Sequence, residues 1–218
     1  MSRIYVYKLT ADNGGAPCIE DGLLSLAICK PMIRRMADKG DLIFGFAANS
    51  LHRDNRLIYV ARITKKLSDG QYYQDSRYRR RRDCIYRFEE GRFVPRKNAR
   101  YHLRPEDLPH DLGEPPRYTR ANVLLSTDFR YFGGSGSDDY KGKFKLVSEA
   151  IQGLGRGHRV HYDRRLYDEL HRMARWIWTS TEHKVIGSPS SEPSGSVCQR
   201  GGSCAIVLNK KDRSAPQI

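Results

Sequence analysis

The stretch SLAICKPMIRRMADKGDLIFGFAANS at residues 25–50, followed by RLIYVARI at 56–63, decides the expected fold. An apolar run leads into a short helix predicted over residues 31–39. Proline is favoured at the first position of a helix, and glycine just past its end. The Gly40-Asp41 turn then precedes a predicted strand over residues 42–47, and a polar loop precedes a second predicted strand over 57–63. Two neighbouring strands after a short helix favour a fold built around a sheet.

Length and composition favour one sizeable domain with a tail. The chain has 218 residues, of which 39% are hydrophobic and 10% aromatic, enough for a packed core. From residue 180 onward the composition turns to serine, proline and glycine. We therefore predict one domain over residues 1–179 and a tail over 180–218, with a possible ordered strand at 204–208.

The remaining elements point to an α+β protein. Alternating or continuous apolar residues predict strands over 3–10 and 123–132, and a hairpin over 84–95. Helical spacing appears over 145–154 and 164–178, the second with Asp163 as its cap. Strands dominate, with about three helices inserted, so we expect a β-barrel core with flanking helices and not a parallel sheet.

The charge balance predicts a polyanionic partner. Lys and Arg number 39 against 25 Asp and Glu, which gives a formal charge of +14. Neutralising phosphates releases counterions, and arginine can donate two hydrogen bonds to one phosphate. Tyrosines between the arginines of residues 72–82 could stack on unpaired bases. The predicted phosphate contacts are Arg34, Arg35, Arg77, Arg79, Arg80, Arg81, Arg82, Arg156, His158 and Arg159.

Each basic segment also has a plainer interpretation. The run RYRRRRD at 77–83 would then be a solvated element, or a loop paired with Glu89 and Glu90. The turn GLGRGHR at 153–159 would simply end a helix. We favour the phosphate interpretation for the first, because clustered arginines repel one another without an anionic partner.

The cysteines predict a reducing compartment without a metal. Five cysteines, an odd number, occur without CxxC spacing, and the pair at 198 and 204 lacks a nearby histidine. The N-terminus lacks a signal-peptide layout, and no apolar run is long enough for a membrane. We predict a cytoplasmic protein with reduced thiols, no cofactor, no bound metal and no membrane partner.

Four stretches carry a family resemblance: LAICKPMIRRMADKGDLIFGF, RLIYVARIT, LLSTDFRYFGG and GLGRGHR. They resemble the PUA-like barrels, a group that includes EVE, YTH and ASCH domains. More narrowly, they are similar to the second family of nucleotide-modification-associated domains. The resemblance implies an EVE-related small β-barrel that binds DNA or RNA, with a modified or flipped base as its target. It also implies a partner modification or restriction enzyme.

Base capture needs a stacking wall and polar groups for the base edge. Phe44 and Phe46 share one face of a strand, where the alternative is plain core packing. Asp128 lies in an apolar strand, so its carboxylate must be paired, exposed or functional. The predicted pocket comprises Asn13, Phe44, Phe46, Asn49, Ser50, Tyr59, Asp128 and Tyr131.

Catalysis is the weaker alternative. Cys18, Cys29 and His158 offer a nucleophile and a base, but no established catalytic motif appears. We therefore predict a non-catalytic module that recognises a modified base in nucleotide modification or phage defence. Two alternatives stay open: an enzyme acting on a modified nucleotide, and a regulatory module for a partner enzyme.

Overall fold

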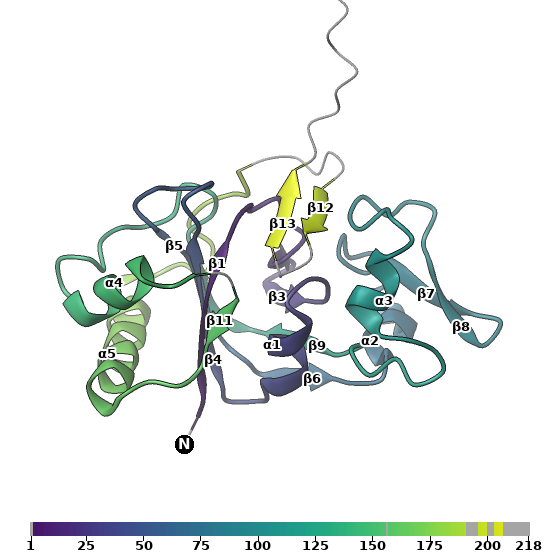
Figure 1. Cartoon of the computed structure of the whole chain (residues 1–218), viewed down its shortest axis with the longest axis horizontal. Coiled ribbons are helices and arrows are strands. Elements are labelled where there is room, and N and C mark those ends of the chain that lie inside the picture. The colour runs from purple at the N-terminus through teal and green to yellow at the C-terminus, as the bar shows by residue number, and fades with distance from the viewer. Residues whose placement is uncertain (1, 156, 191–195, 200–202, 207–218) are drawn as a thin grey trace, which may run out of the picture.

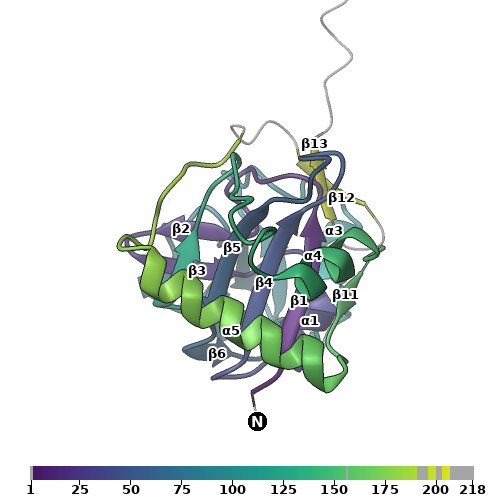
Figure 2. The same ribbon diagram turned by 90° about the vertical axis from the view of Figure 1, so that its left-hand side faces the viewer.

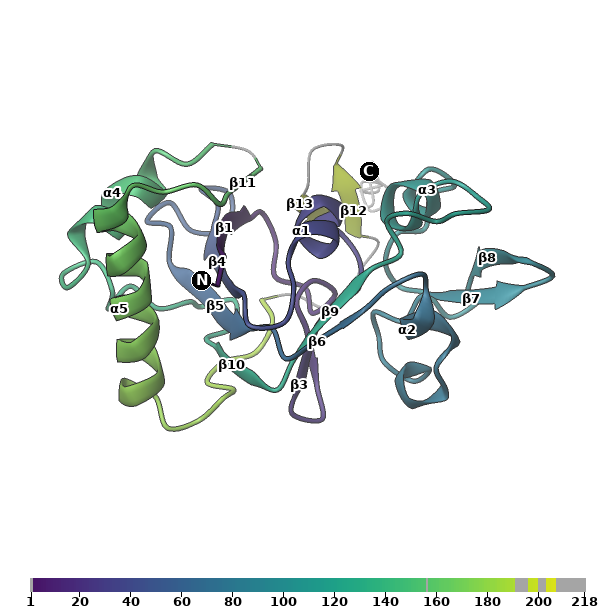
Figure 3. The same ribbon diagram turned by 90° about the horizontal axis from the view of Figure 1, so that it is seen from below.

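The computed structural model describes residues 2–155 and 157–190, and the backbone of 196–199 and 203–206. It is a mixed α+β structure, as predicted, and its layers are seen in succession in Figure 3. Two helices cover a first sheet, a second sheet follows with a short helix, and a lobe of short elements forms the far end. The strands of the two main sheets are β1 (Ile4–Leu9), β2 (Cys18–Glu20), β3 (Leu23–Leu26), β4 (Leu42–Ala47), β5 (Leu57–Arg62), β6 (Lys65–Leu67), β9 (Val123–Ser126), β10 (Asp128–Tyr131) and β11 (His158–Arg159).

The first sheet has the order β10-β5-β4-β1-β11 (Figure 3). β1 runs parallel to β4, whereas the other pairs are antiparallel. Both faces of the sheet are buried, so alternate residues of β1 enter different cores. Ile4 and Val6 face the two helices, and Tyr5, Tyr7 and Leu9 face the second sheet.

The helices on the outer face are α4 (Lys145–Gln152) and α5 (Arg164–Ser180). Figure 2 shows α5 lying across the strands of the first sheet. Asp163 caps α5 by accepting a 2.9 Å hydrogen bond from the Leu166 amide, as its sequence position predicts. Apolar residues of both helices pack on Phe44 and Phe46, which are fully buried.

The second sheet has the order β2-β3-β9-β6 and is joined to the first at a corner. β5 pairs with β10 in the first sheet, while their continuations β6 and β9 pair in the second. The described strands nevertheless form no closed barrel, so the predicted barrel is not confirmed. The physical reason is that β11 has only two residues, and β2 and β6 end the second sheet as unjoined edges.

A separate lobe occupies residues 68–122, between β6 and β9 (Figure 1). Helix α1 (Pro31–Met36) lies between this lobe and the first sheet, and it ends earlier than the predicted residue 39. The lobe's core is aromatic, with Tyr72, Tyr73 and Phe93 buried. The elements of the lobe are α2 (Gln71–Gln74), the 3-10 turn η1 (Ser76–Tyr78), the hairpin strands β7 (Tyr86–Glu89) and β8 (Arg92–Pro95), and α3 (Asp107–Leu112).

The chain after α5 returns to the first sheet. The Tyr131 amide donates to the Lys184 carbonyl over 2.8 Å, and the Gly134 amide donates to the Ser188 carbonyl over 2.8 Å. Farther on, β12 (Ser196–Gln199) and β13 (Ser203–Ile206) form an antiparallel pair. The strand predicted at 204–208 thus overlaps β13, and residues 207–208 lie outside the described part. The proposed domain boundary at 179 stays a prediction.

Candidate functional site

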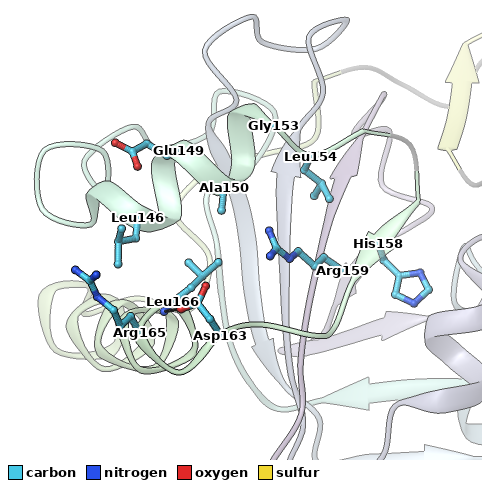
Figure 4. Close-up of a pocket in the computed structure, with 10 residues that line it drawn as sticks. All are labelled: Leu146, Glu149, Ala150, Gly153, Leu154, His158, Arg159, Asp163, Arg165 and Leu166. Carbon is cyan, nitrogen blue, oxygen red and sulfur yellow. Dashed lines mark hydrogen bonds between the residues drawn. The ribbon is translucent and has the colours of Figure 1, made fainter.

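An open cleft lies between α4, β11 and α5 (Figure 4). Its volume is about 760 Å³, and its floor is apolar, from Leu146, Ala150, Leu154 and Leu166. Polar side chains form the rim, and Figure 4 shows that Arg159 points into the cleft, whereas His158 points away from it. The rim residues are Glu149, His158, Arg159, Asp163 and Arg165.

A second hollow of about 690 Å³ continues along the same helices and shares Leu146 and Arg165 with the first. Arg165, Arg172 and Arg175 lie seven and three residues apart on α5, so they follow one face of the helix. Arg172 pairs with the buried Glu169 over 3.7 Å. The two hollows together form a groove with basic groups along one side, which we call the α4–α5 groove.

The Arg159 side chain is held at the rim of the groove. Its Nε donates to the His161 carbonyl over 3.1 Å, and its guanidinium lies 5.4 Å from the centre of the Tyr162 ring. His158 packs on the other side of β11, 6.0 Å from the Tyr5 ring. Burial, together with the positive charge of Lys30, lowers the pKa of His158. Arg156 lies outside the described residues, so its relation to the groove is not described.

The predicted phosphate residues do not form one surface. His158 and Arg159 lie beside α4 and α5, whereas the arginines of 77–82 lie in the lobe at the opposite end (Figure 3). Arg79 and Arg80 are exposed in the lobe, and Arg35 is exposed on α1. Arg77 pairs with Asp75 over 2.5 Å, and Arg82 pairs with Glu20 over 2.7 Å. Carboxylates of the same chain therefore already neutralise part of the repulsion among the arginines of residues 77–82.

Arg81 and Arg34 are enclosed side chains. Arg81 is 8% exposed and donates to the carbonyls of Cys18, Glu20 and Leu23. Arg34 is 0% exposed and donates to four backbone carbonyls, among them Cys29 at 2.6 Å and Asn122 at 2.7 Å. Each of these guanidinium groups joins separate chain segments, which is a structural use of arginine.

The predicted base-pocket residues are likewise dispersed. Tyr59 and Tyr131 are buried between the two sheets, and Phe44 and Phe46 are buried under α4 and α5. Tyr59 hydrogen-bonds to the hydroxyl of Tyr7, and Tyr131 donates to Asp12. The positions of the polar candidates differ again: Asn13 is buried in the loop after β1, Asn49 and Ser50 are exposed after β4, and Asp128 is partly exposed on β10.

Asp128 is a paired carboxylate. Its Oδ2 accepts from Arg62 over 3.1 Å, and its Oδ1 accepts from the Trp178 indole nitrogen over 2.5 Å. The guanidinium groups of Arg62 and Arg130 each lie 5.7 Å from the centre of the Trp178 ring. The sequence left three possibilities for this carboxylate, which could be paired, exposed or functional. The structure shows that it is paired.

A second arrangement of polar groups is buried where α1 meets α3. Cys29 Sγ lies 3.3 Å from Nε2 of His102, and Nδ1 of His102 contacts Oδ2 of Asp111. Asp111 also accepts from the Cys29 amide over 3.0 Å and from the Tyr86 hydroxyl over 2.9 Å. Cys29 is disulfide-bonded, so the prediction of reduced thiols is wrong for this residue, whereas Cys18 and Cys84 are free thiols.

His102 and Asp111 are not among the residues predicted from the sequence. Seventy-three positions separate Cys29 from His102, so no local spacing connects them. Asp111 lies in a proline-rich segment that reads as a loop but contains α3. Within the described residues, no group of three His, Cys, Asp or Glu side chains is arranged to hold a metal ion.

Fold and groove together define a mixed α+β domain of two joined sheets with a partly basic groove on its helical face. The chain belongs to the nucleotide modification associated domain 2 family, whose model matches residues 1–195. That match extends past the predicted domain boundary at 179. No curated protein and no solved structure shows a significant match. None of the helices in the described residues combines the length and apolar character needed to cross a membrane.

Proposed function

We propose that this protein binds nucleic acid through the α4–α5 groove and receives one nucleotide in the cleft beside Arg159. The observation that carries the proposal is the combination within one cleft of an apolar floor and a rim that carries two arginines and two carboxylates. A base presents a flat apolar face, and its phosphate needs charged donors at the edge. Leu146 and Leu166 offer an apolar surface for the base, and Arg159 and Arg165 offer charged donors for the phosphate.

The family membership and the charge of the chain support this proposal. A nucleotide-modification-associated domain is expected to meet nucleotides, and the formal charge of +14 attracts polyanions. Arg172 and Arg175 continue the basic side of the groove along α5. A strand of nucleic acid could follow them with successive phosphates, whether it is DNA or RNA.

We further propose that the bound nucleotide is a modified or flipped base, which the cleft recognises by its edge. Glu149 and Asp163 on the rim can accept hydrogen bonds from amino groups of a base. Kinship with PUA-like domains is part of this proposal, supported by the strands that bend from one sheet into the other. A partner modification or restriction enzyme would then act where the domain binds.

Fluorescence anisotropy with short DNA and RNA strands, with and without modified bases, tests the proposal at two salt concentrations. We expect Arg159→Gln and Arg165→Gln each to weaken binding about tenfold, since hydrogen bonds to charged groups contribute about 1.5–3 kcal/mol. Each should also flatten the salt dependence by roughly one phosphate contact.

Arg164→Gln is the matched control for the binding experiment. Arg164 is the neighbour of Arg165, but it pairs with Asp168 over 2.8 Å and does not line the groove. Its replacement should weaken binding much less than Arg165→Gln does. If the double variant Arg79→Gln, Arg80→Gln abolishes binding while the groove variants bind like the parent, the nucleic acid binds the lobe and the groove assignment is wrong.

A further inference from the structure

The buried contact between Cys29 and His102 places a thiol sulfur beside a histidine nitrogen, as in a nucleophile and its base. Cys29 follows β3 and precedes α1, His102 lies between β8 and α3, and Asp111 is on α3. Nδ1 of His102 donates to the Asp111 carboxylate, so Nε2 is the ring nitrogen that faces Sγ at 3.3 Å. A thiol, an imidazole and an orienting carboxylate in this order are the parts of a cysteine nucleophile.

We propose that Cys29, His102 and Asp111 form a nucleophilic centre that cleaves an acyl substrate, an ester or an amide, once the disulfide bond of Cys29 is reduced. Cys29 supplies the sulfur and His102 moves the proton. Asp111 is a positioning residue that acts through His102. This activity goes beyond nucleic-acid binding and does not depend on the α4–α5 groove.

Asp111 is held as an anion. Burial acts to raise its pKa, but His102, Arg34 and the Tyr86 hydroxyl outweigh burial and lower it. Arg34 is itself fully enclosed, and its Nη2 lies 3.5 Å from Asp111 Oδ1. A fixed carboxylate that can only accept makes His102 carry its proton on Nδ1, which leaves Nε2 as the base toward Cys29.

The backbone at the centre is strained on both sides of the contact. Cys29 has φ 57°, the adjacent Lys30 has φ 44°, and His102 has φ 51°. Residues other than glycine rarely adopt this left-handed region of backbone angles, and those that do cluster at functional sites. Here the strain falls on the two residues that would exchange the proton.

The disulfide bond shows that a second atom can bond to this buried sulfur. Cys29 and His102 are each 1% exposed, and Cys29 is disulfide-bonded. A bonded sulfur shows that the fold accommodates a further atom at covalent distance from Sγ. After reduction by a dithiol, which is oxidised to its own disulfide as two thiols are released, that position can be taken by an acyl carbon.

The reaction then follows from the geometry. The Cys29 thiol gives its proton to Nε2 of His102, and the thiolate forms a carbon–sulfur bond with the substrate carbonyl. The bond to the leaving group breaks, and the leaving group takes the proton from His102. Water, deprotonated by His102, then hydrolyses the thioester to a carboxylic acid and restores the Cys29 thiol. Thiol–disulfide exchange alone would not need a histidine fixed by a carboxylate.

Alkylation by iodoacetamide and acetylation by p-nitrophenyl acetate test the proposal on the whole protein, reduced with a dithiol and desalted. Peptide mass spectrometry reports which cysteine reacts. We expect Cys29 to react at pH 6.5 and to carry an acetyl thioester, with release of p-nitrophenol that Cys29→Ser abolishes. His102→Gln should slow alkylation at pH 6.5 by at least about tenfold and move its midpoint toward the ordinary thiol value of about 8.5.

Three controls separate catalysis from structure. Cys18 and Cys84 are internal standards, because burial raises the pKa of both thiols, that of Cys84 to about 11. His110→Gln replaces a half-buried histidine of α3 and should leave the profile unchanged. The proposal is overturned if Cys29 in the parent reacts no faster than Cys84. It is also overturned if His102→Gln lowers the melting temperature without moving the alkylation profile.

Discussion

The hydroxyl of Tyr131 donates a 2.7 Å hydrogen bond to Oδ2 of Asp12, and both side chains are buried. This contact joins the loop after β1 to β10. The other carboxylate oxygen, Oδ1, has no hydrogen-bond partner within the described residues. Burial raises the pKa of Asp12 to about 6, and the Tyr131 hydrogen bond opposes that shift only in part. The fold therefore favours the protonated acid relative to the unfolded chain.

The first prediction is the pH dependence that Asp12 adds to stability. In the unfolded chain the carboxyl titrates near 3.8, so between pH 4 and 6 the folded state binds more protons. The free energy of unfolding must then fall as pH rises through this window, and it stays lower above pH 6. A shift of about two units corresponds to roughly 3 kcal/mol.

Asp12→Asn removes this titration and isolates its contribution. Urea unfolding of variant and parent at pH 4 and pH 7.5 should show the variant gaining about 2–3 kcal/mol relative to the parent at the higher pH. A difference between the two proteins that is the same at both pH values would show that Asp12 does not titrate in this window.

The second prediction contrasts two adjacent arginines of α1. Arg34 is fully enclosed beside Asp111, whereas Arg35 is exposed. Arg34→Met leaves a buried carboxylate without its cation, which should cost about 3–5 kcal/mol. Arg35→Met should change stability by less than about 0.5 kcal/mol. Chemical denaturation measures both, and equal effects would contradict the burial of Arg34.

Local pattern predicted much of the fold. The strand over 42–47 matches β4, and the helices expected at 145–154 and 164–178 correspond to α4 and α5 within two residues. These elements carry their own signals, such as the Asp163 cap. The interruption of the 123–132 strand at Thr127 was not predicted, because the bend depends on pairing with β5 and β6 across the corner.

The candidate site was less accessible to sequence reasoning. Arg34 reads as a surface base, but its acceptors include backbone carbonyls 86 and 88 residues away. Tyr59 and Phe44 lie in a sheet that is covered on both faces, so an aromatic residue in a strand carries no sign of a pocket. Of the predicted residues that the structure describes, only His158 and Arg159 border the groove, and Arg159 is the one that points into it, because the glycine-rich turn leads directly into β11.

The third prediction concerns Gly45, which pairs with Tyr7 on one flanking strand and Tyr59 on the other. The missing side chain lets the two tyrosine hydroxyls meet at 2.9 Å. A Cβ at this position would overlap the Tyr59 ring and lie 2.7 Å from Leu9 Cδ1. Gly45→Ala should therefore destabilise the protein by about 1–3 kcal/mol through overpacking.

Gly142→Ala is the control for this substitution, because a Cβ at Gly142 would meet no atom within 4 Å. Its melting temperature should stay within a degree or two of the parent, while that of Gly45→Ala falls clearly. If both variants melt together, the space beside Tyr59 must relax at little cost, and the close packing of the tyrosine pair is not required.

The last prediction separates a structural role of Asp128 from a role in base recognition. Asp128 holds Trp178 and Arg62, so it ties the end of α5 to β10 and β5. Asp128→Ala should cost about 1 kcal/mol and shift tryptophan emission to longer wavelength, because the indole loses its acceptor and gains water. Asp54→Ala is the matched control: its carboxylate is 40% exposed against 38% for Asp128, and it binds two cations where Asp128 binds Arg62, but none of its ion pairs involves a tryptophan. That control should leave the emission unchanged and stability within about 0.5 kcal/mol.

Because Asp128 lies outside the groove, both variants should keep the parent's preference among modified and plain bases in the anisotropy assay. Loss of that preference in Asp128→Ala alone would move the base site to β10.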